Sequence, residues 1–124
     1  MYRIDINKVI TLVAGDTFEY KYKVNTGTNI CPVYYSMQDK DHLYFALMEP
    51  NQRFEEAVVK KIYDSTSQDE DGCVTIRLES DDTWYLTSGK YYYTIKLEKY
   101  IDTVEGKDVF DVITTQPKTL FFLV

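Results

Sequence analysis

The sequence has few of the residues on which most catalytic and metal sites depend. Its 124 residues include one histidine, two cysteines and one tryptophan. The single histidine, His42, stands among acids at the entrance of an expected strand, which is typical of a surface residue and not of a Ser-His-Asp triad. Cys31 and Cys73 supply neither a disulfide framework nor a metal quartet. We therefore expect two unpaired thiols, no catalytic residue, no cofactor and no bound metal.

Glycine is scarce as well. Five glycines are spread singly over the turns and form no phosphate-binding loop. The "DEDG" stretch at 69–72 resembles part of a calcium loop, but position twelve of that loop is then Leu78, where a bidentate glutamate is needed. The stretch therefore predicts an acidic turn before a strand.

Basic runs and long apolar runs are also absent. The net charge is −6 and the isoelectric point about 4.7, so direct nucleic-acid binding is not expected. No apolar run approaches the roughly 20 residues that span a bilayer, so we expect no membrane insertion. The first residues lack the basic start and apolar stretch of a signal peptide, so we expect a protein that is made in the cytoplasm and stays soluble.

Tyrosine and alternating apolar residues are what the sequence does contain. Twelve tyrosines are present, and apolar side chains recur with period two in 18–24, 74–79 and 91–97. Weaker strand candidates are 3–13, 32–37, 43–48, 108–114 and 119–124. Turn residues separate these runs. The pattern predicts one all-β domain, 1–124, built as a sandwich of two antiparallel sheets with seven to nine strands.

Two segments depart from this pattern. The stretch 53–63 fits either an amphipathic helix or a strand; its β-branched residues and the Asp71-Gly72 turn favour a strand that pairs 57–63 with 73–79 as a hairpin. The stretch 80–86 predicts a short helical turn that buries Trp84 and Leu86 under the sheet.

The residues around this turn resemble the E–F corner of an immunoglobulin-like sandwich. The residues that carry the resemblance are Asp82, Leu86, Gly89, Tyr91 and Tyr93. In that fold a tyrosine at the start of strand F returns its hydroxyl to backbone a few residues upstream, and the resemblance gives Tyr91 this role. Tyr93 stands where the fold usually has its inter-sheet cysteine, so no such disulfide is expected.

The wider plan of the chain resembles small immunoglobulin-like domains of tailed-phage virion proteins. The segments that carry the resemblance are "GDTFEYKYKV", "DHLYFALMEP" and "DGCVTIRLESDDTWYLTSGKYYYTIKL". The resemblance implies a non-enzymatic virion protein, foremost a capsid auxiliary or decoration subunit, with a baseplate, neck or tail component as the alternative. Its partners would be the major capsid protein or baseplate and neck subunits, with a homo-oligomer possible. A carbohydrate-binding module with outward tyrosines is the other function class.

The chain end suggests where such contacts form. Residues 120–124 are all apolar, and successive side chains of a strand point to opposite faces. A partner or another part of the domain must therefore cover one face. The candidate interface residues are Tyr2, Ile4, Tyr92, Phe121 and Leu123.

Overall fold

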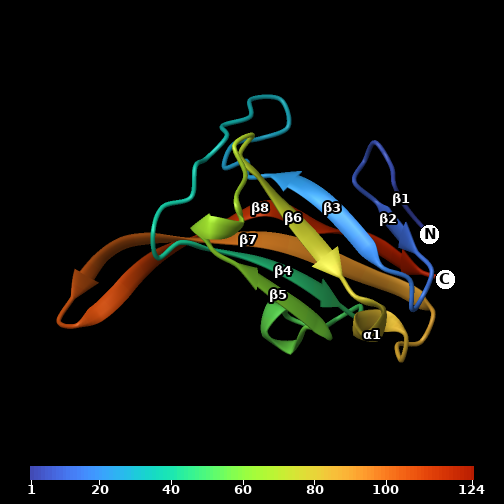
Figure 1. The fold of residues 1–124 in the computed structure, drawn as a ribbon. Coiled ribbons are helices and arrows are strands. Elements are labelled where there is room, and N and C mark those ends of the chain that lie inside the picture. Colours follow the sequence, from blue (N-terminus) through green and yellow to red (C-terminus); the bar gives the residue numbers. More distant parts are fainter.

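The computed structural model describes all residues, 1–124, and folds them into two β-sheets (Figure 1). The strands are β1 (Tyr2–Ile4), β2 (Ile10–Leu12), β3 (Phe18–Lys23), β4 (His42–Met48), β5 (Val59–Tyr63), β6 (Cys73–Leu78), β7 (Gly89–Val104) and β8 (Lys107–Leu123). The helical turns are η1 (Phe54–Glu56), η2 (Ser65–Ser67) and α1 (Ser80–Thr83). Strands hold 53% of the residues and helices 8%, which confirms the all-β prediction.

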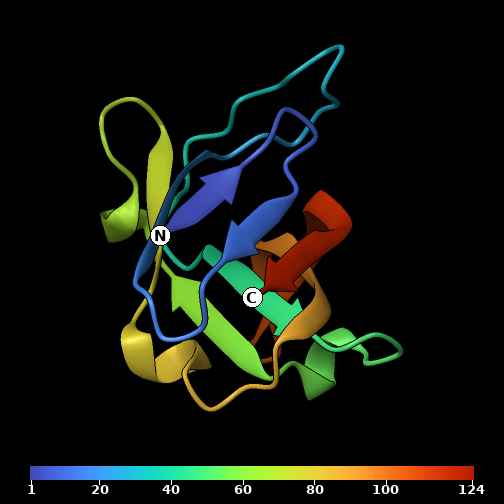
Figure 2. The ribbon, with the colours of Figure 1, turned by 90° about the vertical axis from the view of Figure 1, so that its right-hand side faces the viewer.

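The two sheets differ in size and composition. One has six strands in the order β1-β2-β8-β7-β4-β5, and the other contains only β3 and β6. The prediction of two antiparallel sheets is wrong in one respect, because β2 and β8 run parallel. A turn at 5–9 reverses the chain between β1 and β2, so β2 runs in the same direction as the last strand. Both chain ends consequently lie at one end of the molecule (Figures 1 and 2).

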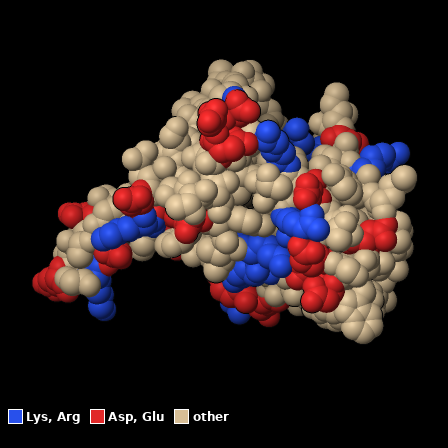
Figure 3. Space-filling model, in the orientation of Figure 1, with Lys and Arg blue, Asp and Glu red and all other residues tan.

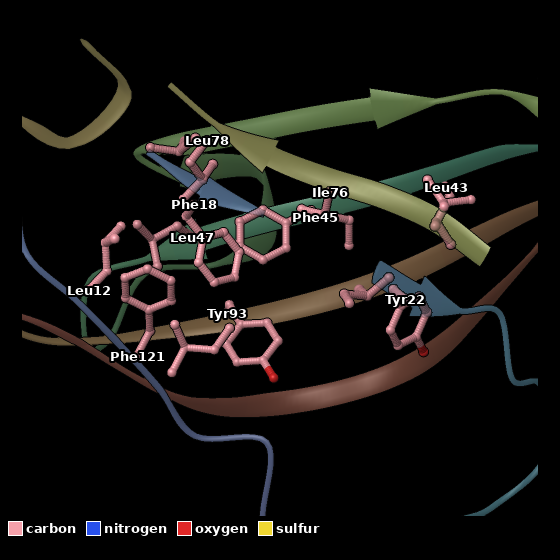
Figure 4. Close-up of a cluster of buried hydrophobic side chains, with 14 of the residues drawn as sticks. Leu12, Phe18, Tyr22, Leu43, Phe45, Leu47, Ile76, Leu78, Tyr93 and Phe121 are labelled. Carbon is pink, nitrogen blue, oxygen red and sulfur yellow. The ribbon is translucent and has the colours of Figure 1, made fainter. Parts of the chain in front are cut away.

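The core lies between the sheets and is built from the alternating residues that the sequence pattern indicates (Figure 4). Phe18 of β3 and Ile76 of β6 face Phe45 of β4, and all three are fully buried. Phe45 stacks on Tyr93 with 5.6 Å between ring centroids. Each such side chain contributes about 1.5–3 kcal/mol when it is buried. The tyrosines of β7 therefore serve mainly as scaffold.

The predicted hairpin of 57–63 with 73–79 is wrong. β5 pairs with β4, and β6 pairs with β3. β5 and β6 belong to different sheets and meet through a side chain, since the Tyr63 hydroxyl accepts the Arg77 N–H at 3.0 Å. The Arg77 N–H lies at the edge of β6, where a strand paired with β6 would have to accept it. The hydrogen bond to Tyr63 takes the place of such pairing with β5. Of the 53–63 stretch, the first part forms η1 and the last part a strand, so the strand interpretation holds only for 59–63.

The loop before β4 also differs from the prediction. A strand was expected at 32–37, but the region forms only a single bridge between Tyr34 and Asn25. The Asn25 side-chain oxygen accepts the backbone N–H groups of Gly27 and Val33, each at 2.9 Å. This side chain supplies partners that a sheet ladder would otherwise provide, so the segment stays a loop.

Strand boundaries differ at both ends of the chain. The expected strand 3–13 is divided, because the Asp5 carboxylate accepts the N–H groups of Asn7 and Val9 and fixes a turn there. The separate strands expected at 108–114 and 119–124 are instead one continuous strand, β8. This continuity makes the β7–β8 hairpin the longest unit of the molecule.

Candidate functional site

The main feature outside the two-sheet body is the end of the β7–β8 hairpin. β7 pairs with β4 only as far as Glu98, and beyond it β7 and β8 continue as a two-stranded ribbon. We call residues 99–111 the arm. Figure 1 shows the arm extending from the body on the side away from both chain termini. No second sheet covers the arm, so its side chains are available to other molecules.

A tight turn closes the tip of the arm. Val104 and Lys107 are the last paired residues, and Glu105 and Gly106 connect them with φ values of 52° and 79°. Two successive residues in the left-handed region give the turn geometry that matches the right-handed twist of a hairpin, and glycine accepts it without strain. The tip is therefore a defined hairpin end and not a long loop.

A buried carboxylate fixes the root of the arm. Asp41 is 1% exposed and accepts three hydrogen bonds. They come from the Tyr35 hydroxyl at 2.6 Å and from the backbone N–H groups of Gln38 and Tyr100, both at 2.8 Å. A buried charge is tolerated only with such partners. Asp41 thus holds the loop before β4 against the first residues of the arm and sets the direction of the projection.

A second contact joins the same loop to the side of the arm. The Lys40 ammonium lies 3.5 Å from the Asp108 carboxylate and 4.6 Å above the ring of Tyr100. The hydroxyl of Thr103 donates to Asp108 at 2.8 Å and, together with the nearby Lys40 charge, lowers the pKa of Asp108. Because these contacts are exposed, they contribute little to the free energy of folding. Their main effect is to help fix the orientation of the arm. They tie the loop to Asp108, which pairs with Thr103 next to the tip.

The exposed surface of the arm is partly aliphatic. Four side chains are more than two-fifths exposed: Ile101 (52%), Val104 (53%), Val109 (41%) and Val112 (64%), the last next to the arm's root. Charged residues of both signs alternate with them, as the mixed colours at the left of Figure 3 show. Single exposed aliphatic residues are ordinary, but here three lie on one projection and a fourth lies beside its root. Such a surface is suited to protein–protein contact.

The predicted corner residues come together at the other end of β7. The Tyr91 hydroxyl donates to the carbonyl oxygen of Thr87 at 2.6 Å, the bond that a corner tyrosine makes. Asp82 accepts the Glu79 N–H at 2.7 Å and binds Lys61 at 2.9 Å, which ties α1 to β5. Leu86 packs partly buried against the core, and Gly89 begins β7. These residues brace the fold.

Tyr93 and Trp84 differ in burial. The Tyr93 hydroxyl donates to the Lys8 carbonyl at 2.6 Å, so this residue, at the place of the usual cysteine, fixes the turn between β1 and β2. The prediction that Trp84 lies under the sheet is wrong, because its side chain is 65% exposed beside the exposed Tyr85. Helix α1 has only four residues, too few to direct both Trp84 and Leu86 inward.

The candidate interface residues do not form one surface. Phe121 and Leu123 are buried in the domain's own core, so the prediction that they contact a partner is wrong. Their side of β8 faces β3, and the ring centroids of Phe18 and Phe121 are 6.2 Å apart. Tyr2 is partly exposed at the edge strand β1, Ile4 packs against the core, and Tyr92 is half-buried under Lys90.

The body has shallow hollows but no enclosed cavity that resembles an active site. The hollow on the outer face of the six-stranded sheet holds about 330 Å³ and is lined by Tyr44, Phe54, Lys60 and Lys96, among others. The two lysine ammonium groups lie 4.4 and 4.9 Å from the centre of the Phe54 ring. Both lie where a sugar stacking on this ring would have to displace them.

Three further properties complete the description. No three histidine, cysteine, aspartate or glutamate side chains converge as they would around a metal ion. None of the helices combines the length and apolar character that crossing a bilayer requires. Both cysteines are free thiols, with Cys31 exposed and Cys73 half-buried, as predicted.

Comparison with known proteins gives no assignment. No family model matches the sequence, no curated protein matches it, and no solved structure matches the fold.

Sequence reasoning did not identify the arm. It placed a strand at 91–97, a turn at 105–107 and a strand at 108–114, and it treated the residues between as unassigned. The usable signal was the stretch "YIDTVEGKDVF" at 100–110, in which β-branched and aromatic residues lie on both sides of a two-residue Glu-Gly turn. Two strands that meet at so short a turn are expected to pair next to it.

Proposed function

We propose that the protein is a non-enzymatic structural subunit of a tailed-phage virion, foremost a capsid auxiliary or decoration protein. The observation that carries the proposal is the arm: a braced hairpin with exposed Ile101, Val104 and Val109 that leaves the body's own core untouched. A domain that presents such a projection is suited to holding other proteins together. A location in the baseplate, neck or tail is the alternative within the same class.

We further propose that the body is an immunoglobulin-like sandwich. In that fold strands B and E pair in one sheet, and strands G, F, C and C′ are neighbours in the other. β3 and β6 correspond to the first pair, and β8, β7, β4 and β5 follow the second order. The Tyr91 hydrogen bond supports the correspondence. The departures are the absence of a third strand beside β3 or β6 and the length of the hairpin that forms the arm.

The arm is expected to contribute to the free energy of assembly mainly through the apolar surface that it buries against a partner and not through its charges. Its exposed aliphatic side chains each contribute a fraction of the 1.5–3 kcal/mol of full burial, and ordering losses are small because Asp41 already fixes the root. The mixed charges around them favour register and partner choice.

The test is a mass-spectrometric inventory of purified virions that carry this gene. Hundreds of copies per particle would support a head location, and a few dozen or fewer would support the baseplate, neck or tail. A matched variant joins Lys99 to Asp111 through Asn-Gly and so removes the arm, while the core residues stay unchanged. Its absence from particles supports assembly through the arm. If the wild-type protein itself is missing from purified particles, the proposal is wrong.

Carbohydrate binding is the second candidate, because Trp84 and Tyr85 form an exposed aromatic pair at the end opposite the arm. No cation lies over either ring, in contrast to Phe54. Trp84 is the only tryptophan, so its fluorescence reports directly on this surface. Saturable changes with an oligosaccharide panel, abolished in Trp84→Ala, would favour this candidate.

A further inference from the structure

The outer edge of β8 is the longest unpaired strand edge in the molecule. β8 pairs with β7 along its length, but its other edge meets β2 only at the last three paired positions, Phe121 to Leu123. Alternate residues from Lys107 onward therefore direct N–H and C=O groups to solvent. Such an edge is a ready template for another strand.

The charges and the proline of this edge locate its accessible part. Charged side chains on an edge strand discourage pairing, and β3 carries Glu19, Lys21 and Lys23, whereas β5 carries Lys60 and Lys61. The β8 edge carries charges of both signs, Lys107, Asp108 and Asp111, which opposite charges on a partner strand can pair with, and the only proline of the strand comes later, at position 117. The accessible part of the edge thus lies in the arm and at its root.

The arm also lacks the layer that normally stabilises strands. A two-stranded ribbon is marginally stable in water, and three or more strands give an independent sheet. Beyond Glu98 only β7 and β8 remain paired. A second ribbon placed along β8 would make four strands.

We propose that the arm pairs with the arm of a second copy, β8 to β8 and antiparallel, around a two-fold axis at Val109. The inference rests on the proposed use of the arm for assembly and names its partner. Two-fold dimers are the commonest closed assemblies, and the same patch serves both copies. The pairing extends from Glu105 to Ile113 and ends before the body begins.

Backbone direction limits the possible registers. Val104 and Lys107 flank a two-residue turn and so face each other across the hairpin. The backbone N–H and C=O groups of successive residues point alternately to the two edges of a strand. Those of Lys107 point to β7, so those of Asp108 and Phe110 point to the open edge of β8. In an antiparallel pair, a residue whose backbone groups point to the open edge must lie opposite another such residue. A two-fold axis at Val109 meets this condition, because it places Asp108 opposite Phe110 of the second copy.

Charge selects among the registers that remain. An axis at Val109 puts Lys107 of each copy opposite Asp111 of the other, which gives two opposite-charge pairs at positions where side chains approach most closely. An axis at Asp111 would set two carboxylates against each other. An axis at Phe110 would place Asp111 opposite Val109 and form no charge pair. In the chosen register Asp108, already bound by Thr103 and Lys40, lies opposite Phe110.

The first experiment measures the dimer constant of the full chain by analytical ultracentrifugation. Lys107→Glu and Asp111→Lys should each weaken dimerisation about tenfold or more, since each change makes two like-charge contacts. The combined variant restores opposite charges and should recover most of the affinity. A wild-type protein that stays monomeric, or a combined variant no better than the single changes, would overturn the proposal.

The second experiment tests the register through disulfides in a Cys31→Ser, Cys73→Ser background. Val109→Cys should cross-link two copies, because its Cα atoms meet across the axis within bonding range. Val112→Cys is the matched control: its two copies lie six residues apart along the strand, about 20 Å, and should not cross-link. Equal cross-linking at both positions would refute the register.

The outcomes separate this inference from the proposed function. A monomer in solution that is nevertheless found in purified particles refutes only the arm-to-arm dimer. A dimer with the predicted cross-link that is absent from particles supports the pairing and refutes the virion function.

Discussion

The two halves of the β7–β8 hairpin have the same local structure but lie in different environments. In the body half Tyr91, Tyr93 and Ile95 are buried beneath β3 and β6. In the arm half Ile101 and Val104 are about half exposed, although the same two strands continue as an antiparallel pair, with a register shift at Ile101. The presence or absence of a second sheet makes the difference. Strand pairing alone therefore does not define a core; the layer above it does.

The comparison also separates two kinds of polar contact. In the body the hydroxyls of Tyr91 and Tyr93 bond to backbone carbonyls and hold turns in place. At the root of the arm Asp41 accepts three donors, two from the loop before β4 and one from the arm, and holds a projection. The first set supports the core and the second sets the direction of a surface. Changes in the body should therefore affect stability, and changes in the arm should affect assembly.

The largest expected effect comes from the body core. Phe45→Ala should lower the free energy of unfolding by about 3–5 kcal/mol, because it leaves a cavity beside Tyr93. Val112→Ala, at the root of the arm, should change it by less than about 0.5 kcal/mol. Urea denaturation of both variants measures the contrast. Similar losses in the two variants would show that the arm is part of the cooperative core.

The next effect concerns alkaline pH. Burial raises the pKa of Tyr22 to about 12, above the value of about 10 in an unfolded chain. The neutral phenol is thus favoured in the folded state, so its contribution of about 2–3 kcal/mol is complete below pH 10 and is lost as the pH rises further. Unfolding free energies from pH 9 to 12 should fall steeply for the wild type and less steeply for Tyr22→Phe. Parallel curves would contradict the burial of this hydroxyl.

A smaller loss is expected at the corner. Tyr91→Phe keeps the ring but removes the hydrogen bond to the Thr87 carbonyl, so it should cost about 1 kcal/mol with little change in fold. The denaturation midpoint and the circular dichroism spectrum measure these two effects. An unchanged midpoint would mean that the corner does not brace the body.

The smallest effect on stability is expected at the tip of the arm. Val104→Ser leaves no cavity and breaks no buried hydrogen bond, so the free energy of unfolding should stay within about 0.5 kcal/mol of the wild type. Assembly should weaken, because the tip loses apolar area. A stability loss as large as that of Tyr91→Phe would show that the arm packs on the body.

Sequence reasoning identified the regions where one face of a strand is buried. Period-two alternation located β3, β6 and the body half of β7, because in each of them one set of side chains enters the core. The resemblance to an immunoglobulin-like corner, and not the alternation, predicted the hydrogen bond of Tyr91 to upstream backbone. The pairing partners of the strands were harder to predict. β5 pairs with β4, and this depends on contacts elsewhere in the fold that the local turn signal at Asp71-Gly72 does not indicate.

The interface prediction was wrong because of a related limit. An unbroken apolar run such as 120–124 indicates that both faces of a strand need cover, but it does not say which side chains face the core. In the structure Phe121 and Leu123 face inward, whereas Leu120 and Phe122 stay partly exposed. The arm was missed because neither of its faces is covered, so no strong alternation marks it. Trp84 was misplaced because hydrophobicity predicts burial only on average.

The most direct test of the account combines two measurements on the variant that joins Lys99 to Asp111 through Asn-Gly. The account predicts that this variant retains most of the wild-type free energy of unfolding, because the core between the sheets is intact. It also predicts that the variant is lost from purified particles when it replaces the wild-type protein. A stable variant that enters particles at the wild-type copy number would contradict the claim that the arm is the assembly surface.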